Sequence, residues 1–133
     1  MPEIMLIRDE AEPWQEVPDF WKAKQKQDDP GLRFKVLIPQ GAASCNMQRT
    51  EYFPGHHEAP HKHPEDEILY ILKGQIHFGR DVLGEGDAIF VPKDKVYSLH
   101  TGDTGCTFVR VGLSSHQTSM SEEDLAAFHA AGA

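Results

Sequence analysis

From Leu32 onward, short apolar and β-branched runs alternate with turn residues such as Gly, Pro and Asp. The runs that we interpret as strands are Phe34–Ile38, Met47–Phe53, Ile68–Leu72, Gln75–Phe78, Ala88–Val91, Val96–Leu99 and Cys106–Val111. Many short strands separated by closely spaced turn signals are typical of an all-β sandwich or barrel. Because closure removes the exposed edges of a sheet, we expect a closed β-barrel over residues 32–114.

The first 31 residues follow a different pattern, since they are rich in charge and proline and have few apolar points. Trp14 and Trp21 are the largest of these points. We expect residues 1–31 to form an N-terminal arm that packs on the barrel. The arm should contain a helical turn over Asp19–Gln27, which the Pro-Gly pair that follows would end.

Residues 115–133 change character again. Ser121 is a candidate N-cap, and Asp124 stands where a capping box has an acid. Leu125 and Phe128 would share one face of a helix. The sequence therefore predicts a short C-terminal helix against the barrel. With 133 residues and no internal repeat, we expect one domain overall.

Composition narrows the possible partners and the compartment. The net charge is −8 and the basic residues are scattered, so nucleic acid and anionic membranes are not expected as partners. No run approaches the ~20 apolar residues of a membrane helix, and the N-terminus has no basic, apolar leader. Cys45 and Cys106 form no CxxC pair, so we expect free, buried thiols, a reducing compartment and a cytoplasmic location.

Histidines are concentrated in one part of the chain, where five of the eight lie within 22 residues. His61 and His63 are two apart, so on a strand they would share a face with Cα atoms roughly 6.5–7 Å apart. A turn follows, and Glu67 opens the next predicted strand on a side where it can meet both histidines. Two imidazoles and one carboxylate suit one divalent ion (Fe, Mn, Ni or Zn) with open positions for a ligand.

The segment from Gly55 to Gly74 resembles the first signature motif of the cupin superfamily, G-x5-H-x-H-x3-E-x6-G. Gly55, His61, His63, Glu67 and Gly74 match every fixed position. The resemblance implies the cupin double-stranded β-helix, a jelly-roll barrel. It also implies a mononuclear metal held by three histidines and one glutamate, and a homodimer.

The second cupin motif, G-x5-P-x-G-x2-H-x3-N, is matched only in part. Gly86 and Pro92 stand at its first two positions. Asp94 replaces the usual glycine, Tyr97 the third histidine ligand, and Thr101 the asparagine. The resemblance therefore implies an altered coordination sphere, with a phenol at the position of one imidazole.

Tyr97 has several possible roles: a phenolate ligand, a hydrogen-bond partner of a metal-bound water, a catalytic acid or base, or a packing residue. His100 is a possible additional ligand, but three residues beyond Tyr97 it faces the other side of a regular strand unless a bulge turns it. His77 is a weaker substitute, because Ile76 and Phe78 make the better core pair.

Other polar residues carry weaker predictions. We interpret His56 and His57 as solvated loop residues rather than ligands. Arg49 and Arg110 are candidates for holding a substrate carboxylate, and a solvated position suits each equally well.

The function hypothesis is an enzyme of the dioxygenase, isomerase or lyase type that acts on a small organic metabolite. His61, His63 and Glu67 would hold its metal, and Tyr97 would serve as acid or base. The alternative is a non-catalytic cupin module that binds or senses a metabolite or a metal.

Overall fold

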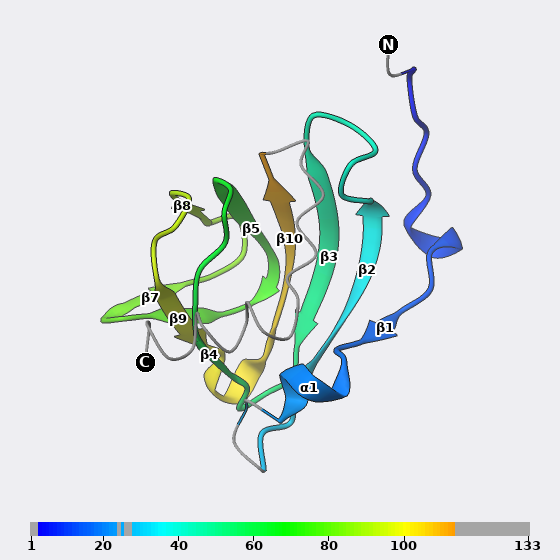
Figure 1. The fold of residues 1–133 in the computed structure, drawn as a ribbon. Helices are drawn as coiled ribbons and strands as arrows, with labels where there is room; N and C mark the ends of the chain where they lie inside the picture. Colours follow the sequence, from blue (N-terminus) through cyan, green and yellow to red (C-terminus); the bar gives the residue numbers. More distant parts are fainter. Residues whose placement is uncertain (1–2, 24, 26–27, 114–133) are drawn as a thin grey trace.

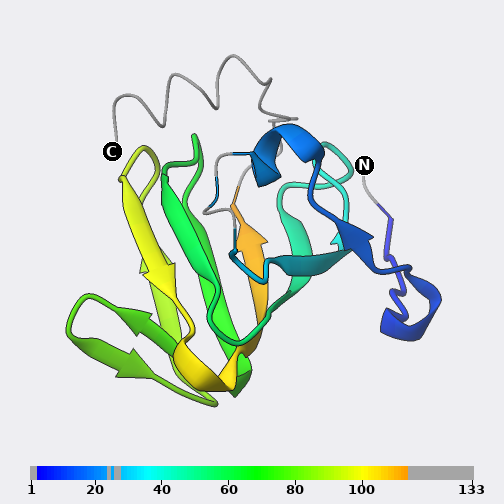
Figure 2. The ribbon, with the colours of Figure 1, turned by 90° about the horizontal axis from the view of Figure 1, so that it is seen from below.

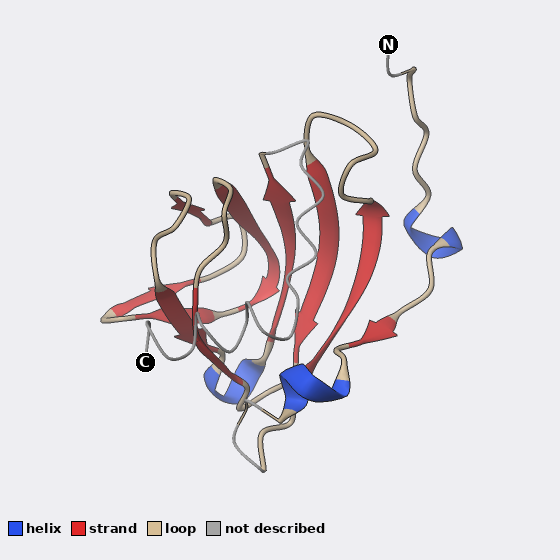
Figure 3. Cartoon of the chain, in the orientation of Figure 1, coloured by secondary structure: helices blue, strands red, loops and turns tan. Residues whose placement is uncertain are grey.

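The computed structural model describes residues 3–23, 25 and 28–113, which form two antiparallel β-sheets that face each other (Figures 1 and 3). The strands are β1 (Gln15–Glu16), β2 (Leu32–Ile38), β3 (Asn46–Tyr52), β4 (His57–His61), β5 (Glu67–Gly74), β6 (Ile76–Phe78), β7 (Asp81–Leu83), β8 (Ala88–Val91), β9 (Tyr97–His100) and β10 (Cys106–Gly112). Helix α1 (Asp19–Lys22) and two 3-10 turns, Asp9–Ala11 and Gly102–Thr104, are the helical elements of the described chain.

The larger sheet has the strand order β1-β2-β3-β10-β5-β8. Strand β10 comes last in the described chain but lies between β3 and β5, so that Phe108 pairs with Thr50 on one side and Ile71 on the other. The smaller sheet has the order β4-β9-β6-β7 and pairs His61 with Tyr97. In Figure 2, β10 (orange) lies near the middle of the view, with β9 (yellow) to one side.

The core lies between the sheets and follows from the period of two along each strand. Leu69 and Ile71 of β5 and Phe108 of β10 point inward and are at most 2% exposed. Burying each such side chain contributes about 1.5–3 kcal/mol. The same inward rows continue into polar residues, Glu67 on β5 and Arg110 on β10, so the core becomes polar toward one end.

The prediction of an all-β domain is confirmed, but the prediction of a closed barrel is wrong. Among the described residues, no strand ladder joins the larger sheet to the smaller one. The sheets are held together by side chains from their inner faces, so closure by hydrogen bonds is not needed. The edge of the larger sheet is instead covered over two residues by the short strand β1.

The N-terminal arm lies against the larger sheet through Trp14. The guanidinium of Arg33 lies 3.9 Å from the centre of the Trp14 ring, and the ammonium of Lys35 lies 4.9 Å from it. Both cations lie within the roughly 6 Å at which the ring attracts them, so these cation–π contacts hold Trp14 against β2. The predicted helical turn over Asp19–Gln27 is too long, because α1 ends at Lys22. The predicted C-terminal helix lies outside the described residues.

Two further findings concern the cysteines and the helices. Both cysteines are free; Cys106 is buried as expected, but Cys45 is only half-buried. None of the helices in the described ranges has the length and apolarity needed to cross a bilayer.

Candidate functional site

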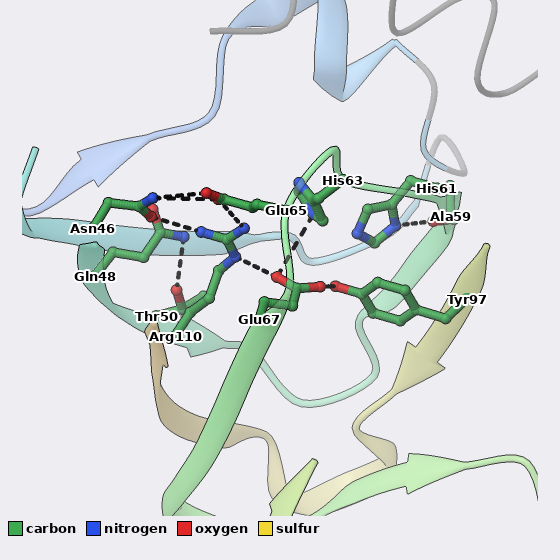
Figure 4. Close-up of polar contacts among 10 residues, drawn as sticks. All are labelled: Asn46, Gln48, Thr50, Ala59, His61, His63, Glu65, Glu67, Tyr97 and Arg110. Carbon is green, nitrogen blue, oxygen red and sulfur yellow. Dashed lines mark hydrogen bonds and ion pairs between the residues drawn. The ribbon is translucent and has the colours of Figure 1, made fainter. Parts of the chain in front are cut away.

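His61 and His63 lie side by side at the rim between the two sheets (Figure 4). His61 is the last residue of β4, and His63 lies in the following loop rather than on the strand. Their ring centres are 4.9 Å apart and the ring planes are nearly perpendicular. The predicted pairing of the two imidazoles therefore holds in space, although only one of them is on a strand.

The loop that carries His63 is braced by the turn before β9. The backbone N–H of Asp94 donates to the carbonyl of His63 at 2.7 Å, and that of Lys93 donates to the Asp66 carboxylate at 2.8 Å. Asp94 has a φ of 62°, in the left-handed region that favours glycine. This conformation explains why the second motif has glycine there, and why aspartate, which tolerates that region better than most residues, can replace it.

Glu67 is the first residue of β5 and is completely buried. Its Oε2 accepts a hydrogen bond from Nε of Arg110 at 2.5 Å and lies 3.9 Å from Nε2 of His63. Its Oε1 accepts a very short hydrogen bond from the hydroxyl of Tyr97 (Figure 4). Glu67 is thus the residue on which His63, Tyr97 and Arg110 converge.

Arg110 is a buried residue that binds carboxylates of its own chain, so the solvated position considered for it is wrong. Besides Glu67, it donates to Glu65 at 2.9 Å and to the amide oxygen of Asn46 at 3.0 Å. Asn46 in turn donates to Glu65 at 3.0 Å. Burial alone would lower the pKa of Arg110, but the charges of Glu67 and Glu65 outweigh it and raise that pKa, so the guanidinium stays charged.

Tyr97 points inward, and its ring centre lies 4.5 Å from that of His61. Burial is the largest reason why the pKa of its phenol is raised well above the ordinary value, and the negative charge of Glu67 is the next. The hydroxyl therefore stays protonated and donates a hydrogen bond to Glu67. In this arrangement Tyr97 is a hydrogen-bond donor to the carboxylate.

Each of the two imidazoles can present a ring nitrogen to a metal. Nδ1 of His61 donates to the carbonyl of Ala59 at 2.8 Å, which leaves the lone pair on Nε2. Burial, followed by the positive charge of Arg110 and the proximity of His61, lowers the pKa of His63 well below its ordinary value. The His63 ring is therefore neutral near pH 7.

The donor set fits a divalent ion in its chemistry, although the side chains are not drawn together around one point. No three His, Cys, Asp or Glu side chains in the described ranges are gathered closely enough to form a metal-binding group. The Glu67 carboxylate has about four lone-pair directions. Arg110 and Tyr97 use two of them. Lone pairs of Glu67, His61 and His63 thus suffice for an ion without loss of either hydrogen bond.

The structure does not bring His100 to this group. As expected from its position after Tyr97, His100 lies on the outer face of the smaller sheet. There its ring stacks on His57 at 4.9 Å and on His77 at 4.7 Å, as measured between ring centres. Ile76 is fully buried, as the predicted core pairing required.

A cavity of about 340 Å³ adjoins the site, a volume that suits a small organic molecule. Its apolar wall includes Leu32, Phe34, Leu69 and Phe108. Its polar wall includes His61, His63, Tyr97, Arg110, Gln48, Thr50, Tyr52 and Glu58. Sequence reasoning missed Glu58, because it occupies a variable position of the motif, although it does share the alternation of β4.

The interpretation of His56 as a solvated loop residue is wrong, since its side chain is fully buried. Nδ1 of His56 lies 2.5 Å from the carboxylate of Asp29, and Nε2 lies 2.8 Å from that of Glu58. Asp29 precedes β2 by a few residues. A partner so distant along the chain cannot be found from local sequence alone.

A family model described as "Cupin domain" matches residues 48–112, which include both motifs. No curated protein matches the chain. Among solved structures, KdgF from a Halomonas species is 17% identical, with a TM-score of 0.62 over 81% of this chain and 93% of that one. An RmlC-like cupin from Ralstonia eutropha JMP134 is 11% identical, with a TM-score of 0.66 over 84% and 69%.

DMSP lyase DddQ from Ruegeria pomeroyi DSS-3 is 20% identical, with a TM-score of 0.67 over 83% of this chain and 60% of that one. This chain therefore spans well under two thirds of that enzyme. At such low identities these likenesses show a shared fold.

Proposed function

The chain belongs to the cupin superfamily, and we propose on this basis that it binds one divalent metal through His61, His63 and Glu67 and acts on a small organic molecule. The observation that carries the proposal is that His61, His63 and Tyr97 line one cavity, while the buried Glu67 carboxylate accepts a hydrogen bond from Tyr97 and lies 3.9 Å from Nε2 of His63. Two imidazoles and a hydrogen-bonded carboxylate are the donors that iron, manganese, nickel or zinc would use.

A metal held there would supply Lewis-acid activation of a bound oxygen atom of the ligand. The protein residues would prepare the site. Arg110 fixes the Glu67 carboxylate by a hydrogen bond, and the backbone carbonyl of Ala59 orients the His61 ring. Tyr97 keeps a proton on its hydroxyl at the cavity wall, where it can act as an acid toward a bound ligand.

The lining of the cavity supports a ligand of mixed polarity. Leu32, Phe34 and Phe108 offer apolar contact, while Gln48 and Thr50 offer hydrogen bonds. The reaction class that we propose is the dioxygenase, isomerase or lyase type. A structural neighbour described as a DMSP lyase adds weight to lyase chemistry.

One observation favours the alternative of a non-catalytic binding or sensing module. Tyr97 stands where cupins have a third histidine, and its hydroxyl is engaged by Glu67. A site with fewer nitrogen ligands can bind a metal or a metabolite without turning it over. Retained metal without turnover of any small carbonyl, hydroxy or thioether compound would select this alternative.

Two further properties are proposed with the function. Ile4 and Leu6 are 93% and 86% exposed, and we propose that a second copy of the chain covers them in a homodimer. The two free thiols suit the cytoplasm. Light scattering of the purified protein tests the first property.

Elemental analysis of protein purified without a histidine tag tests the metal proposal. We expect one divalent ion per chain in the wild type and its loss in His61→Ala/His63→Ala. The matched control is His57→Ala/His77→Ala, which removes two histidines from the outer face and should leave the metal content unchanged. Equal loss in both double variants would contradict the proposed site.

A further inference from the structure

A second polar constellation lies beside the first and centres on His56. Both nitrogens of this fully buried ring face carboxylates, Asp29 at 2.5 Å and Glu58 at 2.8 Å. The side chains of the two acids are 3% and 4% exposed. An ionised carboxylate can only accept, so two such bonds require N–H on both ring nitrogens, which makes His56 an imidazolium.

The electrostatics agree with this geometry. Burial by itself lowers the pKa of His56. The hydrogen bonds and the negative charges of Glu58 and Asp29 outweigh burial, so the pKa of His56 is raised above its ordinary value.

Asp29, His56 and Glu58 form a line of hydrogen-bonded groups, and Asp29 is fixed at its outer end. Besides His56, it accepts hydrogen bonds from the backbone N–H groups of Gly31 and His57, each at 2.8 Å. These bonds hold the carboxylate at the junction between the N-terminal arm and the smaller sheet. The His56 ring therefore has a fixed orientation.

Glu58 forms the inner end, and it lines the same cavity as His61, His63 and Tyr97. His56 binds only Oε2 of this carboxylate. Burial is the main reason why the pKa of the neighbouring Tyr52 phenol is raised well above its usual value, and the charge of Glu58 is the next. The Glu58 carboxylate therefore stands beside Tyr52 in the cavity wall, with the buried His56 ring behind it.

We propose that Glu58 is the proton acceptor of the cavity, and that His56 and Asp29 are the residues that position it. This inference rests on the proposed function, because it takes the cavity to be a ligand site. It adds a catalytic group that lies outside the cupin signature. Burying three ionisable groups carries a desolvation cost that an apolar contact would avoid, so holding the arm in place does not by itself account for them.

The step that Glu58 would perform is a proton abstraction from an acidic C–H or O–H bond of the ligand. The C–H or O–H bond breaks, its electron pair stays on the ligand atom, and the proton bonds to a Glu58 oxygen. The carboxylate becomes a neutral acid, while His56 keeps both protons and its charge. The ligand class is therefore a small molecule with an activated C–H or hydroxyl.

A base in a cavity can be tested without the natural substrate and without metal. The probe is 5-nitrobenzisoxazole, used with protein treated with a chelator. A base removes its ring C–H proton, the C–H electron pair forms the nitrile, and the N–O bond breaks to give a coloured phenolate. We expect saturable turnover by the wild type and a decrease of about 100-fold in Glu58→Gln.

The controls separate this role from a structural one. Glu51→Gln removes a carboxylate on β3 that pairs with Arg33 instead of lining the cavity, and should leave the rate unchanged. Glu58→Asp keeps a carboxylate and should retain part of the rate. Wild-type turnover in Glu58→Gln, or no saturable turnover by the wild type, would overturn the proposal for Glu58.

The positioning role has a spectroscopic readout. In ¹⁵N spectra of histidine side chains, we expect His56 to show two protonated nitrogens at a pH where exposed histidines are neutral, and to lose this signature in Glu58→Gln. A neutral His56 in the wild type would overturn the positioning role. The probe assay needs no metal. Its result therefore stays valid even if the elemental analysis shows that the protein binds no metal.

Discussion

The hydroxyl of Tyr97 donates a hydrogen bond to Glu67, the carboxylate of the first cupin motif. Tyr97 comes from the smaller sheet and Glu67 from the larger one, so this bond crosses the interior. The residue at the third histidine position has therefore become a partner of a proposed metal ligand. This relationship decides what several substitutions should do.

Tyr97→Phe removes the donor and keeps the ring. Glu67 is completely buried, so the loss of one hydrogen bond should lower the free energy of unfolding by about 1–3 kcal/mol, as measured by urea denaturation. Tyr70→Phe on the exposed outer face is the matched control and should change little. Unchanged stability of Tyr97→Phe would show that Glu67 does not depend on the phenol.

Arg110→Met should be more damaging than Tyr97→Phe. It leaves the buried carboxylates of Glu65 and Glu67 without their cation, which should cost about 3–5 kcal/mol in the free energy of unfolding. Adding Glu67→Gln should restore part of the loss, because one unpaired charge is removed. The comparison variant is Arg49→Met, whose pairing with Asp9 is long and more exposed. A fully additive double variant would argue against a coupled network.

Asp94 gives a prediction from backbone conformation. Its φ of 62° strains a branched side chain, so Asp94→Val should lower the free energy of unfolding by about 1–3 kcal/mol, whereas Asp94→Gly should be tolerated. Because the Asp94 N–H binds the carbonyl of His63, the valine variant should also shift the His63 resonances in NMR spectra. Equal stability of the valine and glycine variants would contradict the strain argument.

The raised pKa of His56 predicts how stability depends on pH. The stabilisation is complete below the ordinary value of 6.5 and is lost as pH rises through the higher folded value. The free energy of unfolding should therefore fall as pH rises above 6.5 in the wild type. It should fall less in His56→Gln, as measured by urea denaturation at a series of pH values.

Asp29 acts on the acidic side. Burial by itself raises the pKa of Asp29, but its hydrogen bonds to His56, His57 and Gly31 lower it overall, so its stabilisation holds above 3.8 and is lost as pH falls through the folded value. The two effects thus occupy separate pH ranges.

The His56 prediction has a clear contrary outcome. A constant difference in the free energy of unfolding between wild type and His56→Gln at all pH values above 6.5 would show that His56 does not titrate with folding.

The all-β fold and the nearness of the motif residues could be predicted because their signals are local. The alternation of Leu69 and Ile71 predicts an inward face, and the fixed spacing of His61, His63 and Glu67 places three donors near one turn. The facing of His100 followed from the same period of two. Closure of the barrel could not be predicted in this way, since a pattern of strands does not say whether the outer edges of the sheets pair.

The polar supports could not be predicted, because they come from distant parts of the chain. Arg110 meets Glu67 across 43 positions, and Asp29 meets His56 across 27. Burial of His56 depends on where the arm is packed, which no local pattern encodes. A histidine in a polar stretch of sequence is more often exposed, and here the arm covers it.

The position of a bound metal would show whether His61, His63 and Glu67 are its ligands. Crystals soaked with zinc or cobalt and measured at the absorption edge of the metal would show the ion as an anomalous peak. We predict a peak about 2.0–2.2 Å from Nε2 of His61, from a ring nitrogen of His63 and from the Glu67 carboxylate. A peak only at the stacked His57, His77 and His100, or no peak beside Glu67 at saturating metal, would contradict it.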